Sequence, residues 1–207
     1  SYAMARIPAF NLIETSYKPF KTGQLLAMGA SQFQDPSIPT LPGTQKEIAA
    51  LSTSLKATGQ GEWNVKRLEN QAFTQQRINQ NLAKQPFSVL HLSTHAQFRP
   101  GQVDASYIQL WDQKLKLNGV NAIDWDQSQA DLIVLSACQT ALGDTDAANG
   151  FAGLALKAGV PSAIGTLWSI NDQSTTSLMT GFYSELPNSR TKAQALQTAQ
   201  VAAIRGF

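Results

Sequence analysis

The sequence predicts an α/β protein built on a mostly parallel central sheet with helices on both faces. Apolar runs of strand length alternate with segments of helical periodicity, as in proteins whose parallel strands are joined by helices. The clearest runs, residues 87–94 and 131–137, are mainly apolar and are bounded by polar residues, which is typical of strands buried on both faces. A chain of 207 residues, 43% of them hydrophobic, is long enough to bury the core of one such domain.

Composition and charge exclude several other classes of protein. The net charge is only +2 and the basic residues are scattered, so we expect no nucleic-acid partner. No apolar stretch approaches the roughly 18–20 residues that a membrane span needs, and no signal peptide is visible, so we expect no membrane partner. The single cysteine excludes a disulfide framework within the chain and indicates a reducing compartment, the cytoplasm.

The first elements expected along the chain are a strand, a loop and a helix. Residues 24–29 form a short apolar run that ends at a glycine and predict a strand. Three prolines mark the loop that follows over residues 31–43. Thr44 is expected to cap a helix that extends to about residue 58, and Glu47 three residues later completes a capping box.

The middle of the chain continues this alternation. Residues 63–68 predict a strand, and Thr74 is expected to cap a helix whose apolar face carries Ile78 and Leu82. The first of the two buried strands comes next. It is followed by an insertion over residues 96–117, whose alternating polarity predicts a small hairpin.

The last part of the chain is expected to hold a short helix over residues 118–126, the second buried strand, a helix over 150–157 and a strand over 160–168. Two helices follow. The first begins at Asp172, and the second extends over residues 189–204 without a sequence signal for its end. This order of strands and helices again favours a parallel sheet.

One domain is expected over residues 21–207. Residues 1–20 have little periodicity. We expect them to be an N-terminal extension, or the remnant of an upstream region, with an edge strand near residues 10–14. Because the final helical pattern has no stop signal, we expect the chain to be a domain taken from a longer protein.

The candidate catalytic residues are His95 and Cys138, each of which follows one of the two buried strands. In open α/β sheets the chemistry lies outside the carboxyl ends of the strands, and neighbouring parallel strands are about 4.8 Å apart. If these strands are neighbours, the imidazole can accept the thiol proton and produce a thiolate nucleophile. A lone buried cysteine is more often a small hydrophobic residue, so the hypothesis depends on this pairing.

His91, the only other histidine, is interpreted as a packed strand residue. It lies four residues before His95 on the same face of the strand, and a rise of about 3.3 Å per residue separates the two by about 13 Å. They therefore cannot ligate one metal ion. With one cysteine and no further histidine, a zinc site is not expected, and no cofactor is expected either.

Three further features of the expected crevice have more than one interpretation. The backbone amides of Ala96 and Cys138 either form an oxyanion hole or bond to neighbouring loops. Asp172 either caps the helix that it begins or pairs with a basic side chain of a substrate. From their position and composition, the segments 31–43 and 96–109 are candidates to cover the site.

Five blocks of the sequence, in this order, resemble the CHAT domain. The blocks are LPGTQKE at residues 41–47, LHLSTHA at 90–96, LIVLSACQTALGD at 132–144, AGVPSAIGTLWSIND at 158–172 and LMTGFY at 178–183. CHAT domains are grouped with caspases and separases, which are cysteine peptidases with a caspase-like fold. The resemblance extends over about residues 20–205. It implies a caspase-like three-layer α/β/α sandwich with a mostly parallel central sheet.

The resemblance also implies roles for individual residues. His95 matches the family's general base and Cys138 its nucleophile. Ala96 stands where relatives often have glycine, but the amide that an oxyanion hole needs is retained. Asp172 matches the separase acid that receives an arginine before the scissile bond. Ser136 is the other candidate for the specificity pocket, and it departs from metacaspase-like enzymes, which carry an aspartate at this position, so a preference for basic residues is left open.

The leading hypothesis is a cysteine endopeptidase that hydrolyses peptide bonds in protein substrates and needs no metal or cofactor. One alternative is a catalytically silent CHAT domain that acts as a protein-interaction or regulatory module. Another is a redox switch at Cys138, which would need glutathione or another subunit because the chain has no second cysteine. Relatives are often fused to tetratricopeptide repeats, so the expected partners are a protein or peptide substrate and such domains of a longer parent chain.

Overall fold

A five-stranded sheet stands at the centre of the computed structural model, which describes residues 20–57, 62–99, 102–136, 159–165 and 172–206. The strands are β1 Gly23–Gly29, β2 Trp63–Glu69, β3 Val89–Ser93, β7 Leu132–Ser136 and β8 Ala163–Gly165. They lie in the order β2–β1–β3–β7–β8, and every neighbouring pair is parallel. The predicted parallel sheet is therefore confirmed.

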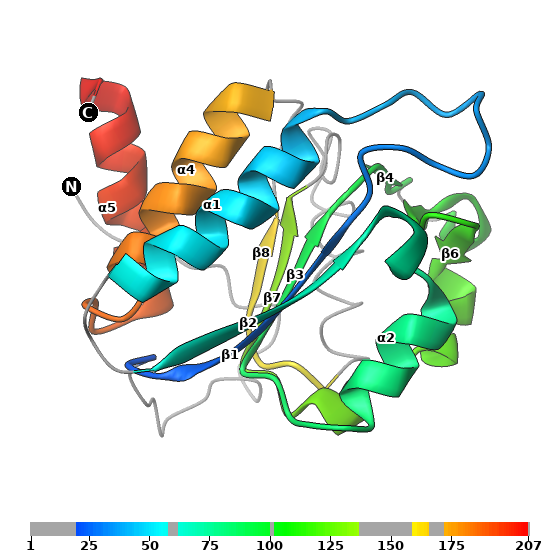
Figure 1. The fold of residues 1–207 in the computed structure, drawn as a ribbon, viewed down its shortest axis with the longest axis horizontal. Helices are drawn as coiled ribbons and strands as arrows, with labels where there is room; N and C mark the ends of the chain where they lie inside the picture. The colour runs from blue at the N-terminus through cyan, green and yellow to red at the C-terminus, as the bar shows by residue number, and fades with distance from the viewer. Residues whose placement is uncertain (1–19, 58–61, 100–101, 137–158, 166–171, 207) are drawn as a thin grey trace.

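Helices cover both faces of this sheet, which makes a three-layer α/β/α sandwich. The helices are α1 Gly43–Ala57, α2 Gln75–Leu82, α4 Asp172–Glu185 and α5 Lys192–Arg205. Figure 1 shows α1, α4 and α5 together on one face and α2 on the other. The predicted hairpin is also present, as β5 Tyr107–Gln109 and β6 Lys114–Lys116, and a third short strand, β4 Ala96–Gln97, extends it to an antiparallel sheet.

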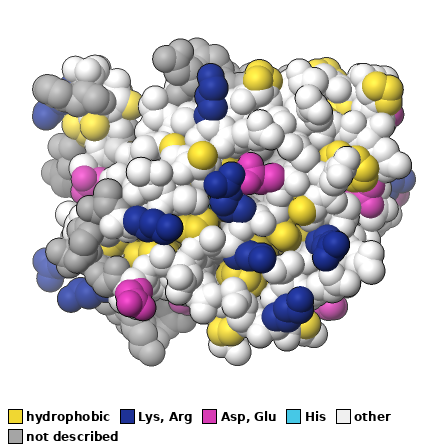
Figure 2. Space-filling view, viewed as in Figure 1, with side chains coloured by type: hydrophobic (Ala, Val, Ile, Leu, Met, Phe, Trp, Pro, Cys, Tyr) yellow, Lys and Arg dark blue, Asp and Glu magenta, His cyan; other side chains and the backbone are white. Residues whose placement is uncertain are grey.

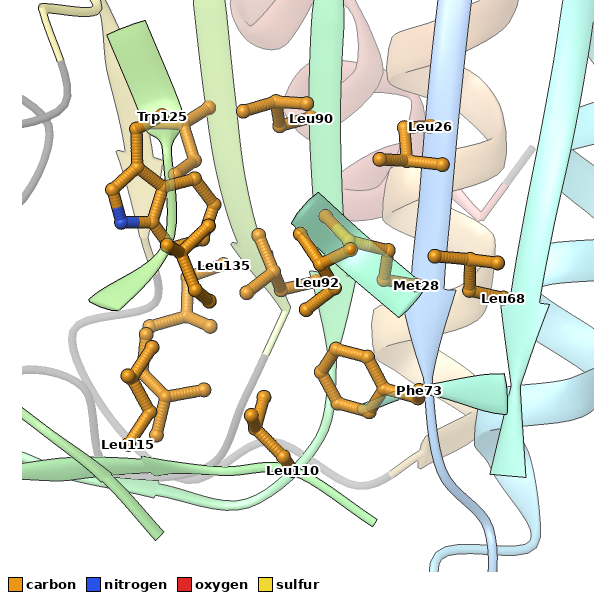
Figure 3. Close-up of a cluster of buried hydrophobic side chains, with 14 of the residues drawn as sticks. Leu26, Met28, Leu68, Phe73, Leu90, Leu92, Leu110, Leu115, Trp125 and Leu135 are labelled. Atoms are coloured by element: carbon orange, nitrogen blue, oxygen red, sulfur yellow. The ribbon is translucent and has the colours of Figure 1, made fainter. Parts of the chain in front are cut away.

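Strand side chains alternate between two hydrophobic clusters, one on each face of the central sheet. In β7, Ile133 and Leu135 belong to the cluster that includes the apolar face of α2, whereas Leu132 and Val134 belong to the cluster under α1 and α4. Figure 3 shows the first of these clusters. All four side chains are fully buried, as expected for a strand with an apolar run and helices on both sides.

One predicted helix cap is confirmed, and two other predictions about helix ends are wrong. Thr74 caps α2 as predicted, since its hydroxyl oxygen accepts a hydrogen bond from the Arg77 amide at 3.4 Å. Thr44 was the wrong cap for α1, which begins at Gly43 and places Thr44 inside its first turn. The prediction that the last helix lacks a stop signal is also wrong, because Gly206 ends α5 in the left-handed conformation, with φ 76°.

The segment after the hairpin does not form the one short helix predicted over residues 118–126. It forms two 3₁₀ helices instead, η4 Leu117–Ala122 and η5 Trp125–Ser128. The other 3₁₀ helices among the described residues, η2 Asn70–Ala72 and η3 Val103–Ala105, lie earlier in the chain. Asn118, Gly119 and Asn121 lie in this segment, and both residue types favour turns over a continuous α-helix.

Some predicted elements lie partly or wholly outside the described residues. The strand predicted over residues 160–168 is described only as β8. The helix predicted over 150–157 and the edge strand predicted near 10–14 are outside the described ranges. The same is true of Cys138.

Candidate active site

The two strands that lead to the predicted catalytic residues are neighbours in the sheet, as the hypothesis requires. The last residue of β3, Ser93, pairs in register with the last residue of β7, Ser136. His95 follows Ser93 by two residues, and Cys138 follows Ser136 by two residues in the sequence. His95 therefore lies just beyond the end of β3. The neighbouring strand, β7, is the one from which the chain continues to Cys138.

The imidazole of His95 is half-buried and contacts the segment between β1 and α1. Its Nε2 atom lies 2.7 Å from the carbonyl oxygen of Pro39, and its ring centroid lies 5.3 Å from that of Phe33. A carbonyl oxygen only accepts hydrogen bonds, so Nε2 carries the proton and donates it. In the neutral ring Nδ1 then carries no proton and is a hydrogen-bond acceptor. A general base takes up a proton at such an unprotonated nitrogen.

The segment that holds His95 is a closed loop, which we call the 31–41 loop. The amide of Leu41 donates to the carbonyl oxygen of Ser31 at 2.9 Å and brings the two ends together. At its tip, the Ser37 side chain and amide hydrogen-bond to the Asp35 carboxylate, and these two bonds lower the pKa of Asp35. The sequence predicted a loop that could cover the site. It did not predict that the Pro39 carbonyl would orient His95, because any residue supplies such a carbonyl.

Ala96, the residue whose amide is predicted to serve the oxyanion hole, directly follows His95. It is the first residue of β4, pairs in register with Ile108 of β5, and is 7% exposed. The residue that directly follows His95 is therefore fixed by strand pairing in the small antiparallel sheet. The role of the Ala96 amide in an oxyanion hole stays a prediction.

Ser136, a predicted specificity residue, lies buried at the end of β7. Among the described residues its hydroxyl oxygen has no hydrogen-bond partner. Its register partner Ser93 donates to the Thr44 hydroxyl of α1 at 3.4 Å. Strand side chains two positions apart share a face, so Ser136 lies on the side of the sheet covered by α1 and α4.

Asp172, the other predicted specificity residue, is the first residue of α4, as the sequence predicted. In Figure 1 the helices α1 and α4 both begin at the end of the sheet toward which the strand arrows point. The backbone of Asp172 is therefore at the same end of the sheet as His95. Its side chain is outside the described part of the structure, so both interpretations of its carboxylate stay open.

His91 forms a separate and fully buried polar network with two helices. Its Nε2 atom lies 2.8 Å from Oε1 of Glu47 on α1, and its Nδ1 atom lies 3.1 Å from the hydroxyl oxygen of Tyr183 on α4. His91 and Tyr183 are 0% exposed and Glu47 is 3% exposed. His91 is thus a packed strand residue, as predicted. The predicted capping role of Glu47 is wrong, because its carboxylate faces His91 across the core.

Burial and the Glu47 carboxylate fix some of the polar hydrogens in this network. Burial raises the pKa of Tyr183 well above its ordinary value, and the nearby Glu47 carboxylate raises it further. The phenol therefore keeps its proton at neutral pH. The Glu47 carboxylate only accepts hydrogen bonds, so Nε2–H of His91 donates to it. Both ring nitrogens of His91 are engaged in this network, so this histidine has no nitrogen left for catalysis.

The fold and this strand-end histidine define the class of the protein: a caspase-like α/β protein with a candidate catalytic base beyond its central strand. The family model of the CHAT domain matches residues 1–206, so the chain belongs to the CHAT family. CHAT domains are part of the caspase-like, cysteine-peptidase-related superfamily. No curated protein matches the sequence.

Membrane-spanning helices and metal-ion clusters are both missing from the described part of the chain. None of its helices is both long and apolar enough to cross a membrane. Within the same ranges, no three His, Cys, Asp or Glu side chains gather in a way that could hold a metal ion. On the surface, Figure 2 shows Lys and Arg side chains spread over the viewed face, with uncharged and acidic side chains among them.

Proposed function

We propose that this CHAT domain is a cysteine endopeptidase with His95 and Cys138 as its catalytic dyad. The observation that carries the proposal is the register of β3 and β7, in which Ser93 pairs with Ser136. Each dyad residue follows one member of this pair by two residues, and two residues of chain span at most about 7 Å. Because neighbouring parallel strands are about 4.8 Å apart, we expect the imidazole and the thiol to meet beyond these strand ends.

In the proposed mechanism His95 acts first as a general base. The Pro39 carbonyl oxygen, 2.7 Å away, accepts the Nε2–H hydrogen bond, so Nδ1 accepts the proton of the Cys138 thiol. The same carbonyl then stabilises the imidazolium that forms. The buried aspartate of a Ser-His-Asp triad does this for its histidine. The thiolate attacks the scissile carbonyl carbon. The imidazolium returns its proton to the leaving amine, and water hydrolyses the thioester to release the acid and restore the thiol.

The backbone amides of Ala96 and Cys138 are proposed to stabilise the oxyanion of the tetrahedral intermediate. Ala96 directly follows His95 and is held by β4, which would fix its amide relative to the imidazole. Loss of one oxyanion donor typically costs about 100- to 1,000-fold in rate.

The proposed specificity is for a basic residue before the scissile bond. Asp172 is the charged candidate for recognising it, because α4 begins at the same end of the sheet as His95. A carboxylate forms strong charge-assisted hydrogen bonds with a guanidinium group. Ser136 contributes an uncharged hydroxyl on the α1–α4 side of the sheet. In this proposal Asp172 is therefore the residue that selects a positively charged side chain of the substrate.

The proposed partners are a protein or peptide substrate and further domains of a longer parent chain, such as tetratricopeptide repeats, in the cytoplasm. No nucleic acid and no membrane is proposed as a partner. The scattered basic residues and the small net charge of +2 argue against a nucleic-acid partner, and the single cysteine favours the cytoplasm.

The test is cleavage of a positional peptide library in reducing buffer by the wild type, Cys138→Ala and His95→Ala. We expect cleavage by the wild type only. Cleavage that persists in Cys138→Ala would refute the mechanism. Absence of cleavage by all three proteins, with no labelling of Cys138 by a thiol-reactive peptide probe, would instead favour the interaction module. Reversible oxidation of Cys138 by mild peroxide, without cleavage, would favour the redox switch.

The specificity proposal has its own variant and matched control. Asp172→Asn removes the charge at the start of α4, and Asp112→Asn removes a charge from the exposed turn of the hairpin. We expect Asp172→Asn to lower cleavage after Arg and Lys by about 10-fold or more, with little change at other residues and none in the control. Cys138-dependent cleavage with no preference for Arg or Lys would keep the mechanism and discard the pocket.

A further inference from the structure

His95 is held from two directions by one loop. The Pro39 carbonyl oxygen lies 2.7 Å from Nε2, while the ring of Phe33 lies 5.3 Å from the imidazole at an interplanar angle of 33°. The first contact fixes the direction of one nitrogen. The second limits rotation of the ring about that hydrogen bond. The orientation of His95 therefore depends on where the 31–41 loop is held.

The amide side chain of Asn70 anchors the start of this loop. Its Oδ1 atom accepts hydrogen bonds from the Ser31 amide at 2.8 Å, the Ser31 hydroxyl at 3.1 Å and the Gln32 amide at 3.3 Å. Asn70 itself has the left-handed backbone conformation, with φ 48°. Asparagine tolerates this conformation better than most residues, and a residue kept there by several bonds is a candidate for a specific role.

A second anchor lies on the other side of Phe33. The amide of Gln34 donates to the carbonyl oxygen of Trp111 at 2.9 Å, and the amide of Trp111 donates to the carbonyl oxygen of Phe73 at 3.0 Å. Phe33 also packs against the hydrophobic cluster on the α2 side of the sheet. Residues 31–34 are thus fixed both to the turn after β2 and to the hairpin.

We infer that Asn70 and Phe33 are positioning residues for His95, with Asn70 acting through the 31–41 loop. The hydrogen bond from Leu41 to Ser31 closes this loop, so a shift of the end held by Asn70 also shifts Pro39. The loop fixes one imidazole tautomer, and that tautomer leaves Nδ1 free to accept a proton. The inference rests on the proposed function for its catalytic meaning, but the geometry that it predicts is measurable without any cleavage.

The test uses the fact that the chain has two histidines. Long-range proton–nitrogen NMR spectra of histidine-labelled protein report the tautomer of each ring, and His91 serves as an internal reference. The variant Asn70→Gly removes the side-chain acceptor while glycine still adopts the left-handed conformation. Phe33→Leu removes the aromatic face but keeps an apolar side chain. The matched control is Gln129→Gly, because Gln129 is exposed and also left-handed, with φ 54°.

We expect His95 to be an Nε2–H tautomer in the wild type and in Gln129→Gly. In Asn70→Gly and Phe33→Leu we expect both tautomers of His95, with the His91 signals unchanged. With a cleavable peptide, kcat should fall about 10- to 100-fold at constant KM in these two variants. Wild-type His95 signals in both variants would overturn the inference. Equal displacement of the His91 and His95 signals would also overturn it, because it would indicate a general loss of structure.

These outcomes remain distinct from failure of the proposed function. If the wild type cleaves no peptide, the NMR comparison still decides whether Asn70 and Phe33 position the imidazole. If Cys138 proves catalytic but the His95 tautomer does not respond to either variant, the proposed function stands and the inference fails.

Discussion

Substituting Tyr183 with phenylalanine tests the buried network that joins α1, β3 and α4. The change removes one oxygen atom and leaves the ring. The lost bond is the 3.1 Å contact between the Tyr183 hydroxyl and Nδ1 of His91, two groups in side chains that are 0% exposed. No water can replace the phenol without a change in packing, so the buried Nδ1 of His91 is left without a hydrogen-bond partner. Such a loss costs about 1–3 kcal/mol, and we expect the free energy of unfolding to fall by that amount.

Urea denaturation at neutral pH measures this effect. The dependence of the unfolding free energy on urea should be unchanged, because the folded surface is the same. Tyr107→Phe is the matched control, since Tyr107 is only half-buried on β5 and should change stability by less than about 0.5 kcal/mol. If Tyr183→Phe were equally mild, the network would not contribute to stability in the way the geometry indicates.

The same variant has a predicted pH dependence. Burial, followed by the Glu47 charge, raises the pKa of Tyr183 in the folded state, whereas the phenol of the unfolded chain ionises near pH 10. Above that pH the unfolded state binds fewer protons than the folded state, so stability falls as pH rises, by about 1.4 kcal/mol per pH unit. The contribution is fully present below about pH 10. Tyr183→Phe should lack this fall, and equal slopes for both proteins would refute the reasoning.

Three further substitutions have predicted effects on the urea midpoint. His91→Leu should cost about 3–5 kcal/mol because it leaves the Glu47 carboxylate buried without its partner, and adding Glu47→Leu should recover part of this loss. Gly29→Ala should cost about 1–3 kcal/mol, since its Cβ would lie 2.3 Å from the backbone oxygen of Ser93; an unchanged midpoint would contradict that contact. Thr74→Ala removes the α2 cap and should cost about 1 kcal/mol, which helix content measured by circular dichroism would also report.

Most of the fold could be predicted from the sequence because its signals are local. The apolar runs of β3 and β7, and the cap at Thr74, each depend on a few consecutive residues. The errors have local causes too. Because α1 begins at Gly43, the predicted cap Thr44 lies inside the helix. The glycine that ends α5 comes directly after the last helical residue, Arg205, and a single residue there is a weak signal.

The partners of the candidate site residues could not be predicted in the same way. Glu47 lies 44 residues from His91 and Tyr183 lies 92 residues from it, so their contact depends on how α1 and α4 pack on the sheet. Pro39 lies 56 residues from His95 and contributes only a backbone oxygen, which carries no sequence signal. The spacing of His95 beyond its strand was visible in the sequence, but the atom that selects its tautomer was not.

The different fates of the two histidines follow from where the regular structure of β3 ends. His91 lies within β3 and is fully buried, whereas His95 follows the end of β3 and is half-buried. At His91 the sheet is covered by α1 and α4, whose side chains contact both ring nitrogens. His95 lies beyond the last strand residue, Ser93, where the 31–41 loop supplies the carbonyl oxygen that accepts a hydrogen bond from Nε2. A catalytic base needs one nitrogen fixed and the other available, and on this strand the position just past its end is the one that supports such a base.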